Sequence, residues 1–434
     1  MNNNKFFLKS YGCQMNVYDS NKITSILESK GYEQNNSAED ADLIIFNTCN
    51  IRDKAAHKLY SDIGRTMNSK EKTIAVVGCV AQAENSEIFK KNNSVDIVLG
   101  PQSYHLLPQM IEDIKKFPNQ INTDFIVNEK FDYLSEQSRP QGVSSFITIQ
   151  EGCDKFCSFC VVPFTRGPEY SRSTESIINE ANLLTKQGAR EIVLLGQNVN
   201  AYEDNSTNSR KTLGNLINDL STNENVKRIR YTTSHPINMD DKLIECHMKN
   251  EKLMPFLHLP IQSGSSKILK KMNRKYDRDF YKKLIYRLKK ANPIIEISSD
   301  FIIGYPGETD RDFQETLDLI DEIKFTQSYS FIYSKRPGTK AASELDKIPI
   351  SVKKERLKIL QQKLKDIQYD FNKTFCNKNI DILIENQSVT NPNYFFGRTP
   401  FMQPVYIKST NLKIGDIKNI TITTCNHKSM YGNC

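Results

Sequence analysis

Three apolar runs near the start of the chain each end at a cysteine, and this repeated pattern limits the folds that the chain can adopt. The runs and the residues that follow them are 6–12 with Cys13, 42–48 with Cys49, and 73–78 with Cys79. Near-continuous apolar runs of this length are typical of strands buried on both faces of a sheet. A helix-like segment follows each run, at 19–30, 53–67 and 81–90, and a fourth run lies at 95–99. The alternation predicts an α/β domain with a parallel sheet over residues 1–125.

This architecture predicts where the three cysteines lie. In a parallel sheet the carboxyl ends of all strands share one edge, and open α/β folds bind ligands at that edge. Cys13, Cys49 and Cys79 are therefore expected to converge, although they lie far apart in the chain. Each one taken singly would more often be a small buried hydrophobe than a ligand. Three repetitions of the same pattern favour a site with three thiolates.

A second group of cysteines lies close together in the chain. Cys153, Cys157 and Cys160 are spaced as C-x3-C-x2-C after a strand-like run at 146–149. Thiolates are soft ligands that select zinc, Cu(I) or iron–sulfur clusters. Structural zinc and an ordinary 4Fe–4S cluster both take four protein ligands, but the next cysteine is the distant Cys246. A cluster held by three thiolates would keep one iron open for a small chelating molecule. A zinc knuckle and three buried thiols are the alternatives.

With Phe156 and Phe159 between the ligands, this spacing resembles the signature of the radical S-adenosylmethionine (SAM) superfamily. The resemblance implies that the amino and carboxylate groups of SAM bind the open iron. Over residues 140–370, six strand-like runs alternate with helical ones, which predicts a partial TIM-like barrel of the (β/α)6 type, the usual radical-SAM core. The six runs are 146–150, 191–195, 228–232, 256–260, 295–303 and 327–333.

The loops after these strands are polar, and in β/α barrels such loops carry the working residues. By position in the superfamily's motifs, the resemblance implies SAM contacts for Gln197, Asn198, Ser234 and Gly304. Each has a structural alternative. A glycine can serve a turn that needs its backbone freedom, and the polar side chains can form hydrogen bonds within a loop.

Segments 11–20, 47–55 and 78–82 resemble the N-terminal domain of the methylthiotransferase family of radical-SAM enzymes. The resemblance covers essentially the whole chain. It implies that the N-terminal cysteines hold a second 4Fe–4S cluster, which holds or donates sulfur. The implied activity is the addition of a methylthio group to carbon 2 of N(6)-isopentenyladenosine next to the tRNA anticodon. One SAM would give a 5′-deoxyadenosyl radical at the other cluster, and a second SAM would give the methyl group.

Two alternatives stay open at this point. A sibling methylthiotransferase would act on a threonylcarbamoylated adenosine in tRNA or on an aspartate of a ribosomal protein. Segments 11–16 and 47–55 favour the isopentenylated base instead. A protein of another class would be a non-enzymatic zinc protein that binds RNA through its C-terminal region.

The C-terminal region changes to short strand-like runs. Runs at 380–384, 397–399, 405–407 and 417–423 follow a helical segment at 351–373. They predict a small closed β-barrel, OB-like, over residues 373–434. The stretch resembles a TRAM domain, but its tail at 429–434 departs from the usual one. That departure leaves the pairing of the last strand open, and Cys434 is not expected to be a ligand.

This barrel carries cations and aromatic residues together. Arg398, Lys408 and Lys413 suit contact with phosphate, and aromatic residues at 394–396 and 401 suit base stacking. The expected partner is therefore the anticodon loop of a tRNA. A solvated surface over a packed aromatic core is the alternative.

Charge and composition narrow the expected surroundings. The chain has 434 residues, with 59 Lys and Arg against 51 Asp and Glu, and its net charge of +8 fits an RNA partner. No apolar stretch approaches the roughly 20 residues that span a bilayer, and the start lacks the apolar core of a secretory signal. Metal-binding cysteines require a reducing compartment. We expect a cytoplasmic monomer that uses an electron-donor protein and a sulfur and cluster supply system. The polar stretch 115–140 is expected to connect the first two domains.

Overall fold

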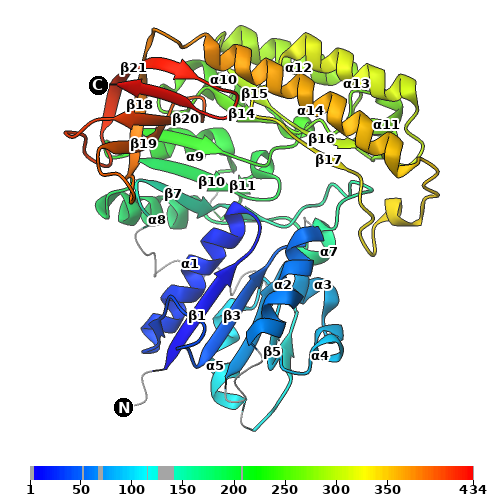
Figure 1. Cartoon of the computed structure of the whole chain (residues 1–434), viewed down its shortest axis with the longest axis vertical. Coiled ribbons are helices and arrows are strands. Elements are labelled where there is room, and N and C mark those ends of the chain that lie inside the picture. Colours follow the sequence, from blue (N-terminus) through cyan, green and yellow to red (C-terminus); the bar gives the residue numbers. More distant parts are fainter. Residues whose placement is uncertain are drawn as a thin grey trace.

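The computed structural model describes residues 4–50, 53–66, 72–114, 116–125, 141–206 and 209–433. An N-terminal sheet domain, a central β/α barrel and a small C-terminal β-barrel follow one another along the chain (Figure 1). This is the predicted fold class. The predicted connection falls largely on residues 126–140, outside the described residues. Within the described ranges, we find no helix with the length and apolar character that crossing a bilayer demands.

The N-terminal domain is a six-stranded parallel sheet in the order β2-β1-β3-β4-β5-β6. Its strands are β1 (Lys5–Ser10), β2 (Glu33–Gln34), β3 (Leu43–Thr48), β4 (Thr73–Gly78), β5 (Ile97–Leu99) and β6 (Gln120–Asn122). Its helices are α1 (Gln14–Ser29), α2 (Asp53–Thr66), α3 (Cys79–Glu84), α4 (Glu87–Lys91) and α5 (Leu107–Asp113). Alternate strand residues face opposite layers. Leu43 and Ile45 pack with α1 and α5, whereas Ile44 and Phe46 pack with α2 and α3.

Local details of this domain differ from the prediction. α1 begins at Gln14, before the predicted start at residue 19, with Cys13 as its N-cap. The predicted helix at 81–90 is two short helices, and the first begins at Cys79 itself. The stretch predicted as a connection from residue 115 contains β6, which pairs with β5. β2 and β6 are polar edge strands, so no apolar run marks them in the sequence.

The central domain is an open barrel of parallel strands, which confirms the predicted (β/α)6 architecture. Its strands are β7 (Ser144–Thr148), β10 (Glu191–Leu195), β13 (Arg228–Tyr231), β14 (Phe256–His258), β15 (Glu296–Ser298), β16 (Asp300–Ile303) and β17 (Tyr329–Ile332). Single bridges, Ile229 to Leu253 and Gln262 to Phe301, link the hydrogen-bonded groups. β15 and β16 divide the predicted run 295–303.

Most helices of this domain surround the barrel on its outer side, whereas the first lies against the N-terminal domain (Figure 1). The helices are α7 (Val162–Arg166), α8 (Thr174–Lys186), α9 (Leu213–Ser221), α10 (Asp241–Lys249), α11 (Ser266–Lys271), α12 (Arg278–Ala291), α13 (Asp310–Ile323) and α14 (Ile350–Lys373). A short hairpin, β8 (Gln150–Glu151) with β9 (Tyr170–Ser171), brackets the second cysteine group. α14 runs the length of the barrel and leads into the C-terminal domain.

The C-terminal domain is a closed barrel in the order β18-β19-β20-β22-β21. Its strands are β18 (Asn379–Gln387), β19 (Tyr394–Arg398), β20 (Pro404–Lys408), β21 (Ile417–Cys425) and β22 (Met430–Asn433). β22 pairs in parallel with β20 and antiparallel with β21. The last strand, whose pairing the sequence left open, therefore closes the barrel, while Cys434 lies outside the described residues.

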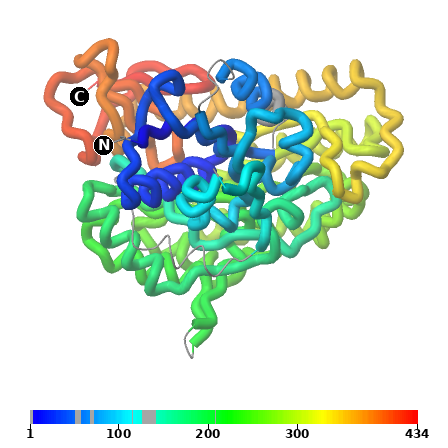
Figure 2. Tube along the Cα trace, turned by 90° about the horizontal axis from the view of Figure 1, so that it is seen from below, coloured from blue at the N-terminus to red at the C-terminus, as the bar shows by residue number. Residues whose placement is uncertain are grey.

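The N-terminal domain is seated on the barrel through α1. Met15 and Tyr18 pack with Val193 and Leu195 of β10, and Figure 2 shows the blue N-terminal elements over the green barrel. This contact sets the carboxyl edge of the sheet against the barrel loops. Arg166 of the central domain donates to Cys79 Sγ at 3.3 Å, which agrees with that orientation.

Buried charges reinforce both domain contacts. Glu180 of α8 accepts from Lys22 of α1 and from Arg172, each at 2.7 Å. Burial opposes the ionisation of Glu180, but the two cations outweigh it and lower its pKa to about 2. At the C-terminal barrel, Arg228 and Arg230 each donate two hydrogen bonds to backbone carbonyls of that domain, at distances from 2.8 to 3.0 Å.

Candidate active site

The three N-terminal cysteines meet at the carboxyl edge of the sheet, as the strand pattern predicts. Cys13 caps α1, Cys49 follows β3, and Cys79 begins α3. The thiols of Cys13 and Cys49 share a hydrogen bond, and Cys79 lies within electrostatic reach of Cys13. Because each cysteine belongs to a different β/α unit, only the folded sheet brings them together.

Polar side chains beside the cysteines fix the spacing of the strand ends. Asn16 of α1 donates to the carbonyls of Tyr11 and Thr48, each at 2.8 Å, which ties β1 to β3. Thr48 Oγ1 donates to the Val77 carbonyl at 2.6 Å and accepts from the Val80 N–H at 3.1 Å, which ties β3 to β4. The residues next to the cysteines therefore hold the site in shape.

Cys49 lies against Gly12 on one side and forms a hydrogen bond with Cys13 on the other. Gly12 has a φ of +105°, and a Cβ there would stand 2.6 Å from Cys49 Sγ, so glycine is required. The hydrogen bond from Cys49 lowers the pKa of the Cys13 thiol to about 6, although burial opposes this. Burial raises the pKa of Cys79. The contact with Cys49 therefore favours the thiolate form of Cys13, whereas burial favours the thiol form of Cys79.

A buried arginine from the barrel reaches into this site. Arg166, at the end of α7, donates to Cys79 Sγ at 3.3 Å, to Asp19 at 2.8 Å and to Glu151 at 3.3 Å. Asp19 belongs to α1, and Glu151 precedes Cys153 by two residues. Arg166 therefore connects a thiol of the N-terminal group to the loop that carries the second group.

The second cysteine loop is held by its own backbone. Gly152 has a φ of +76°, and a Cβ there would collide with the backbone beyond α7. The N–H of Cys153 donates to the Gly167 carbonyl at 3.1 Å, and that of Cys160 donates to Cys157 at 2.9 Å. Burial raises the pKa of Cys153 to about 12 and that of Cys160 to about 11. Cluster loading at this loop must therefore release protons.

The chemistry of this loop fits an anionic cluster. Arg274 is buried, and it donates to Cys157 Sγ at 3.4 Å, to the Tyr276 hydroxyl at 2.8 Å and to the Pro260 carbonyl at 2.6 Å. None of these partners is a carboxylate, so thiolates would supply the missing negative charge. Among the described residues, no three His, Cys, Asp or Glu side chains converge as the ligands of a single metal ion do. Cluster ligands lie further apart, because each thiolate binds its own iron.

Two of the predicted SAM residues lie beside this loop. Gln197 Oε1 accepts from the Gly152 N–H at 2.6 Å, and its Nε2 contacts the Met15 sulfur. Gln197 therefore holds the cysteine loop and α1 together. Asn198 Nδ2 donates to Glu169 at 2.8 Å, while its buried Oδ1 has no partner among the described residues.

Ser234 and its neighbour His235 also present unpaired polar atoms. Ser234 Oγ and His235 Nε2 are buried without a partner in the described part of the chain. His235 Nδ1 accepts from the Ile237 N–H at 3.3 Å, so the neutral ring carries its proton on Nε2. Burial lowers the pKa of His235 to about 2, which keeps the ring neutral. These atoms fit a polar ligand such as SAM. His235 is not among the residues predicted from the sequence, and only its place after Ser234 marks it.

The fourth predicted SAM residue, Gly304, lies in a tight turn after β16. Its φ is +71°, a Cβ there would stand 2.6 Å from the Lys353 side chain, and its N–H donates to Glu308 at 2.9 Å. These contacts supply the structural reason for glycine that the sequence left open. Because glycine has no side chain, Gly304 could contact SAM only through its backbone.

The three predicted RNA-binding cations lie on the C-terminal barrel in different surroundings. Arg398 pairs with Glu385, and its guanidinium lies 5.0 Å from the centre of the Phe396 ring. Lys408 and Lys413 are exposed. The two lysines are therefore placed to meet phosphate, whereas Arg398 is already engaged within the barrel.

The aromatic residues of this barrel divide into core and surface. Phe395 is buried in the core, and Phe401 packs against that core. Phe396, Tyr406 and Tyr431 lie side by side on β19, β20 and β22, with ring centroids 5.5 and 5.7 Å apart. The two tyrosines are not among the residues predicted from the sequence. They lie in register with Phe396 across the strands, on the face opposite to that of the buried Phe395.

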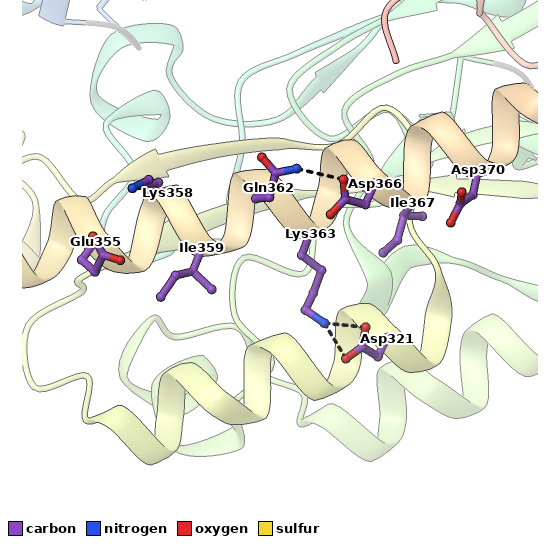
Figure 3. Close-up of a pocket in the computed structure, with 9 residues that line it drawn as sticks. All are labelled: Asp321, Glu355, Lys358, Ile359, Gln362, Lys363, Asp366, Ile367 and Asp370. Carbon is purple, nitrogen blue, oxygen red and sulfur yellow. Dashed lines mark hydrogen bonds and ion pairs between the residues drawn. The ribbon is translucent and has the colours of Figure 1, made fainter. Parts of the chain in front are cut away.

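A groove of about 550 Å³ lies between α13 and α14 (Figure 3). Its walls carry charged side chains, and Lys363 pairs with Asp321 across it at 2.6 Å. None of its lining residues belongs to either cysteine group. The groove is therefore separate from the candidate chemistry.

Comparisons with known proteins match this arrangement. Family models match the uncharacterized protein family UPF0004 at residues 5–100, the radical SAM superfamily at 147–320 and the TRAM domain at 373–433. A Rickettsia canadensis protein named tRNA-2-methylthio-N(6)-dimethylallyladenosine synthase is 50% identical over 437 residues, which cover 97% of this chain and 98% of the relative. This chain belongs to that synthase family. A synthase of the same name from Rickettsia felis is 50% identical and covers 99% of each chain. The resemblance to the methylthiotransferases is thereby confirmed.

Solved structures extend the likeness of this synthase-family chain to the fold. The radical SAM methyltransferase TsrM from Kitasatospora setae aligns with a TM-score of 0.58 and 13% identity, over 78% of this chain and 74% of that one. The cobalamin-dependent radical enzyme OxsB aligns with a TM-score of 0.52 and 12% identity, over 84% and 56%. At such low identity they support the radical-SAM fold alone.

Proposed function

We propose that this chain, like the synthases it resembles, adds a methylthio group to carbon 2 of N(6)-isopentenyladenosine next to the tRNA anticodon. The observation that carries the proposal is the pair of three-cysteine groups, which Arg166 joins through Cys79 and Glu151. The names of the relatives support the substrate. An enzyme that must activate one carbon and deliver sulfur to it needs two such sites close together.

The two cysteine groups would each hold one 4Fe–4S cluster, with SAM on the open iron of the second. The ligands would be Cys13, Cys49 and Cys79 at the first cluster and Cys153, Cys157 and Cys160 at the second. When bound, these groups supply the radical chemistry, the sulfur and the methyl group that an unactivated aromatic C–H requires. The three-thiol donor sets and the buried Arg274 support this assignment.

The protein's own residues bind, orient and exclude water. Gln197 acts as a positioning residue that holds the second cysteine loop. Asn198 Oδ1 and Ser234 Oγ offer hydrogen bonds to SAM, His235 donates from Nε2, and Gly304 offers its backbone. The three side-chain atoms are buried and lack partners among the described residues, which supports this role. Packing of α1 against the barrel would shelter the space between the two cysteine groups from water.

The RNA must offer its adenosine as an unstacked base. Single-stranded anticodon loops allow this, because their bases can be splayed and stacked on protein side chains. Lys408 and Lys413 would contact phosphates, with Arg398 as a support for the aromatic surface. The TRAM match over the C-terminal barrel supports RNA contact by this domain.

Several expectations around this reaction belong to the same proposal. An electron-donor protein would reduce the second cluster, and a sulfur and cluster supply system would restore the first. The enzyme would act as a cytoplasmic monomer. Its domains would be residues 1–125, 140–370 and 373–434.

Serine replacement at the three N-terminal cysteines together tests the division of labour. With dithionite as reductant, the variant should still cleave SAM, because the three thiols of the second group remain, while methylthiolation of RNA should vanish. Cys246→Ser, outside both groups, is the control and should retain both activities. Equal loss of SAM cleavage and methylthiolation in the triple variant would contradict separate roles.

Two further measurements test the alternatives. In tRNA from cells that lack the protein, N(6)-isopentenyladenosine without its methylthio group should accumulate; a change in threonylcarbamoyladenosine products instead would point to a sibling substrate. Anaerobically reconstituted protein should hold about eight irons with matching sulfide. Two zinc ions and no sulfide would instead support a non-enzymatic RNA-binding protein.

A further inference from the structure

Two phenylalanine rings form an exposed pair beside the second cysteine group. Phe156 and Phe164 are 54% and 50% exposed, and their ring centroids lie 6.4 Å apart with planes at 78°. Phe156 stands between Cys153 and Cys157 in the second cysteine loop. Phe164 stands on α7, which packs against α3 and ends at Arg166. Both rings therefore lie beside the second cysteine group, and the helix that carries Phe164 also carries the arginine that contacts Cys79.

The backbone at Phe156 is strained, and its surroundings maintain the strain. Its φ of +47° lies in the left-handed region, which a bulky residue rarely adopts. Asn273 Nδ2 donates to the Phe156 carbonyl at 2.8 Å, and the next residue but one, Ser158, donates its N–H to the Met272 carbonyl at 3.0 Å. Strain of this kind persists only where surrounding contacts hold it, and it clusters at functional sites. A ring that only filled the core would be buried, but this one faces solvent.

We propose that Phe156 and Phe164 form a stacking platform for an RNA base next to the modified adenosine. The inference rests on the proposed function, because extrusion of one adenosine leaves its neighbours unstacked. Aromatic side chains bind such bases through their flat faces. Lys155 and Lys271 flank the loop with side chains 24% and 40% exposed, in loose ion pairs of 3.8 Å. They add positive charge for the RNA backbone.

The position of the pair favours RNA over a reductant protein. A reductant needs to approach only the second cysteine group, since that group would carry the cluster that cleaves SAM. The substrate adenosine must reach both groups, and its neighbouring bases must lie along the same path. Because the pair joins the second cysteine loop to α7, whose Arg166 contacts Cys79, it lies where that path must pass.

A set of variants separates stacking from simple apolar cover. Phe156→Leu keeps an apolar side chain on the same backbone but removes the ring, whereas Phe156→Tyr keeps the ring. Phe164→Leu repeats the test on α7, outside the cysteine loop. The matched control is Phe117→Leu. Phe117 is 64% exposed and precedes β6, at the edge of the sheet opposite the cysteines.

The measurement is the Kd of anaerobically reconstituted holoenzyme for an anticodon stem-loop RNA that carries N(6)-isopentenyladenosine. Each leucine variant at the platform should weaken binding about tenfold, as loss of one base–aromatic stack does. Phe156→Tyr and Phe117→Leu should bind as the wild type does. Iron content and RNA-independent SAM cleavage with dithionite should stay unchanged in Phe164→Leu and Phe117→Leu, which lie outside the cysteine loop, and the same two measurements on the Phe156 variants separate loss of the cluster from loss of stacking.

Three results would overturn the platform. Unchanged RNA affinity in both leucine variants would contradict it while leaving the proposed function intact. A loss of turnover with a protein reductant, restored by dithionite at unchanged RNA affinity, would show a reductant-docking surface instead. Wild-type enzyme that neither binds nor modifies this RNA would contradict the proposed function and the platform together.

Discussion

The two cysteine groups gather the same number of thiols by opposite means. The first takes Cys13, Cys49 and Cys79 from the ends of separate β/α units, whereas the second carries its thiols on one loop between Cys153 and Cys160. A site assembled from strand ends exists only in the folded sheet. A short loop keeps its thiols near one another in any conformation. Loading of the first site therefore depends on the fold of a domain, and loading of the second depends on local loop geometry.

The buried arginines of the two sites differ in the same way. Arg166 contacts Asp19 and Glu151 as well as Cys79, so its charge is balanced within the protein. Arg274 contacts Cys157 but no carboxylate among its hydrogen-bond partners. One arginine is therefore balanced in the folded protein before any cluster binds, whereas the thiolates of the proposed cluster would balance the other.

The largest expected effect separates these arginines in the protein without clusters. Arg166→Gln removes the cation that Asp19 and Glu151 share, and should lower the free energy of unfolding by about 3–5 kcal/mol. Arg274→Gln removes a cation that has no carboxylate partner in the described part of the chain, and should change the free energy of unfolding by less than about 1 kcal/mol. Urea denaturation of both variants measures the difference. Equal losses would contradict the proposed contrast in charge balance.

A somewhat smaller loss of stability is expected at the contact between α1 of the N-terminal domain and the barrel. Glu180→Gln leaves Lys22 and Arg172 buried without their shared carboxylate and should destabilise the protein by about 3 kcal/mol. The pKa of Glu180 is lowered from 4.5 to about 2 in the folded protein. Its stabilising effect is therefore complete above pH 4.5 and is lost as the pH falls toward 2.

Denaturation of wild type and Glu180→Gln across this pH range checks the prediction, since their difference should shrink as the acid side is approached. Glu245→Gln, in an exposed ion pair with Lys249, is the control and should have no measurable effect. Methylthiolation should fall more than SAM cleavage in Glu180→Gln, because α1 holds the first site against the barrel. A pH-independent difference would refute the assigned charge state.

In the enzyme with both clusters bound, each of the two arginines should change the reduction potential of one cluster only. Hydrogen bonds to cluster sulfurs raise the reduction potential, so Arg274→Gln should lower that of the second cluster only, and Arg166→Gln that of the first only. A shift of about 60 mV corresponds to about 1.4 kcal/mol, the size of one charge-assisted hydrogen bond. Redox titrations followed by EPR spectroscopy measure both. A shift of both clusters in either variant would break the comparison.

The smallest expected effect lies outside both sites. Tyr406→Ala removes the central ring of the row on the C-terminal barrel and should weaken RNA binding about fivefold. Iron content and SAM cleavage should remain unchanged. Tyr286→Ala, on the exposed face of α12, is the control for the loss of a surface tyrosine. Unchanged RNA affinity in Tyr406→Ala would remove this row from the RNA-binding surface.

Sequence patterns predicted the repeated β/α units of the N-terminal domain and the compact loop of the second cysteine group. The apolar runs before Cys13, Cys49 and Cys79 specified a parallel sheet and hence their shared edge, because strand direction leaves no other arrangement. The spacing of Cys153 and Cys160 indicated a compact loop. The polar edge strand β6 escaped prediction, because an edge strand needs no apolar run.

Contacts between distant segments could not be read from the chain. Nothing near Arg166 in the sequence indicates that it reaches Cys79 and Asp19, since that contact depends on how α1 is seated on the barrel. His235 and Gln197 acquire their roles from the same packing. Long-range burial decides which polar atoms stay unpaired, and no local pattern encodes it.

The central claim is that the chain builds two independent three-thiol sites, and iron analysis of two serine triples tests it most directly. Wild-type protein reconstituted without oxygen should hold about eight irons, and each triple should hold about four. The N-terminal triple should keep the irons that support SAM cleavage, and the loop triple should keep the others. A triple that loses all of its iron, or loses none, would contradict two separate sites.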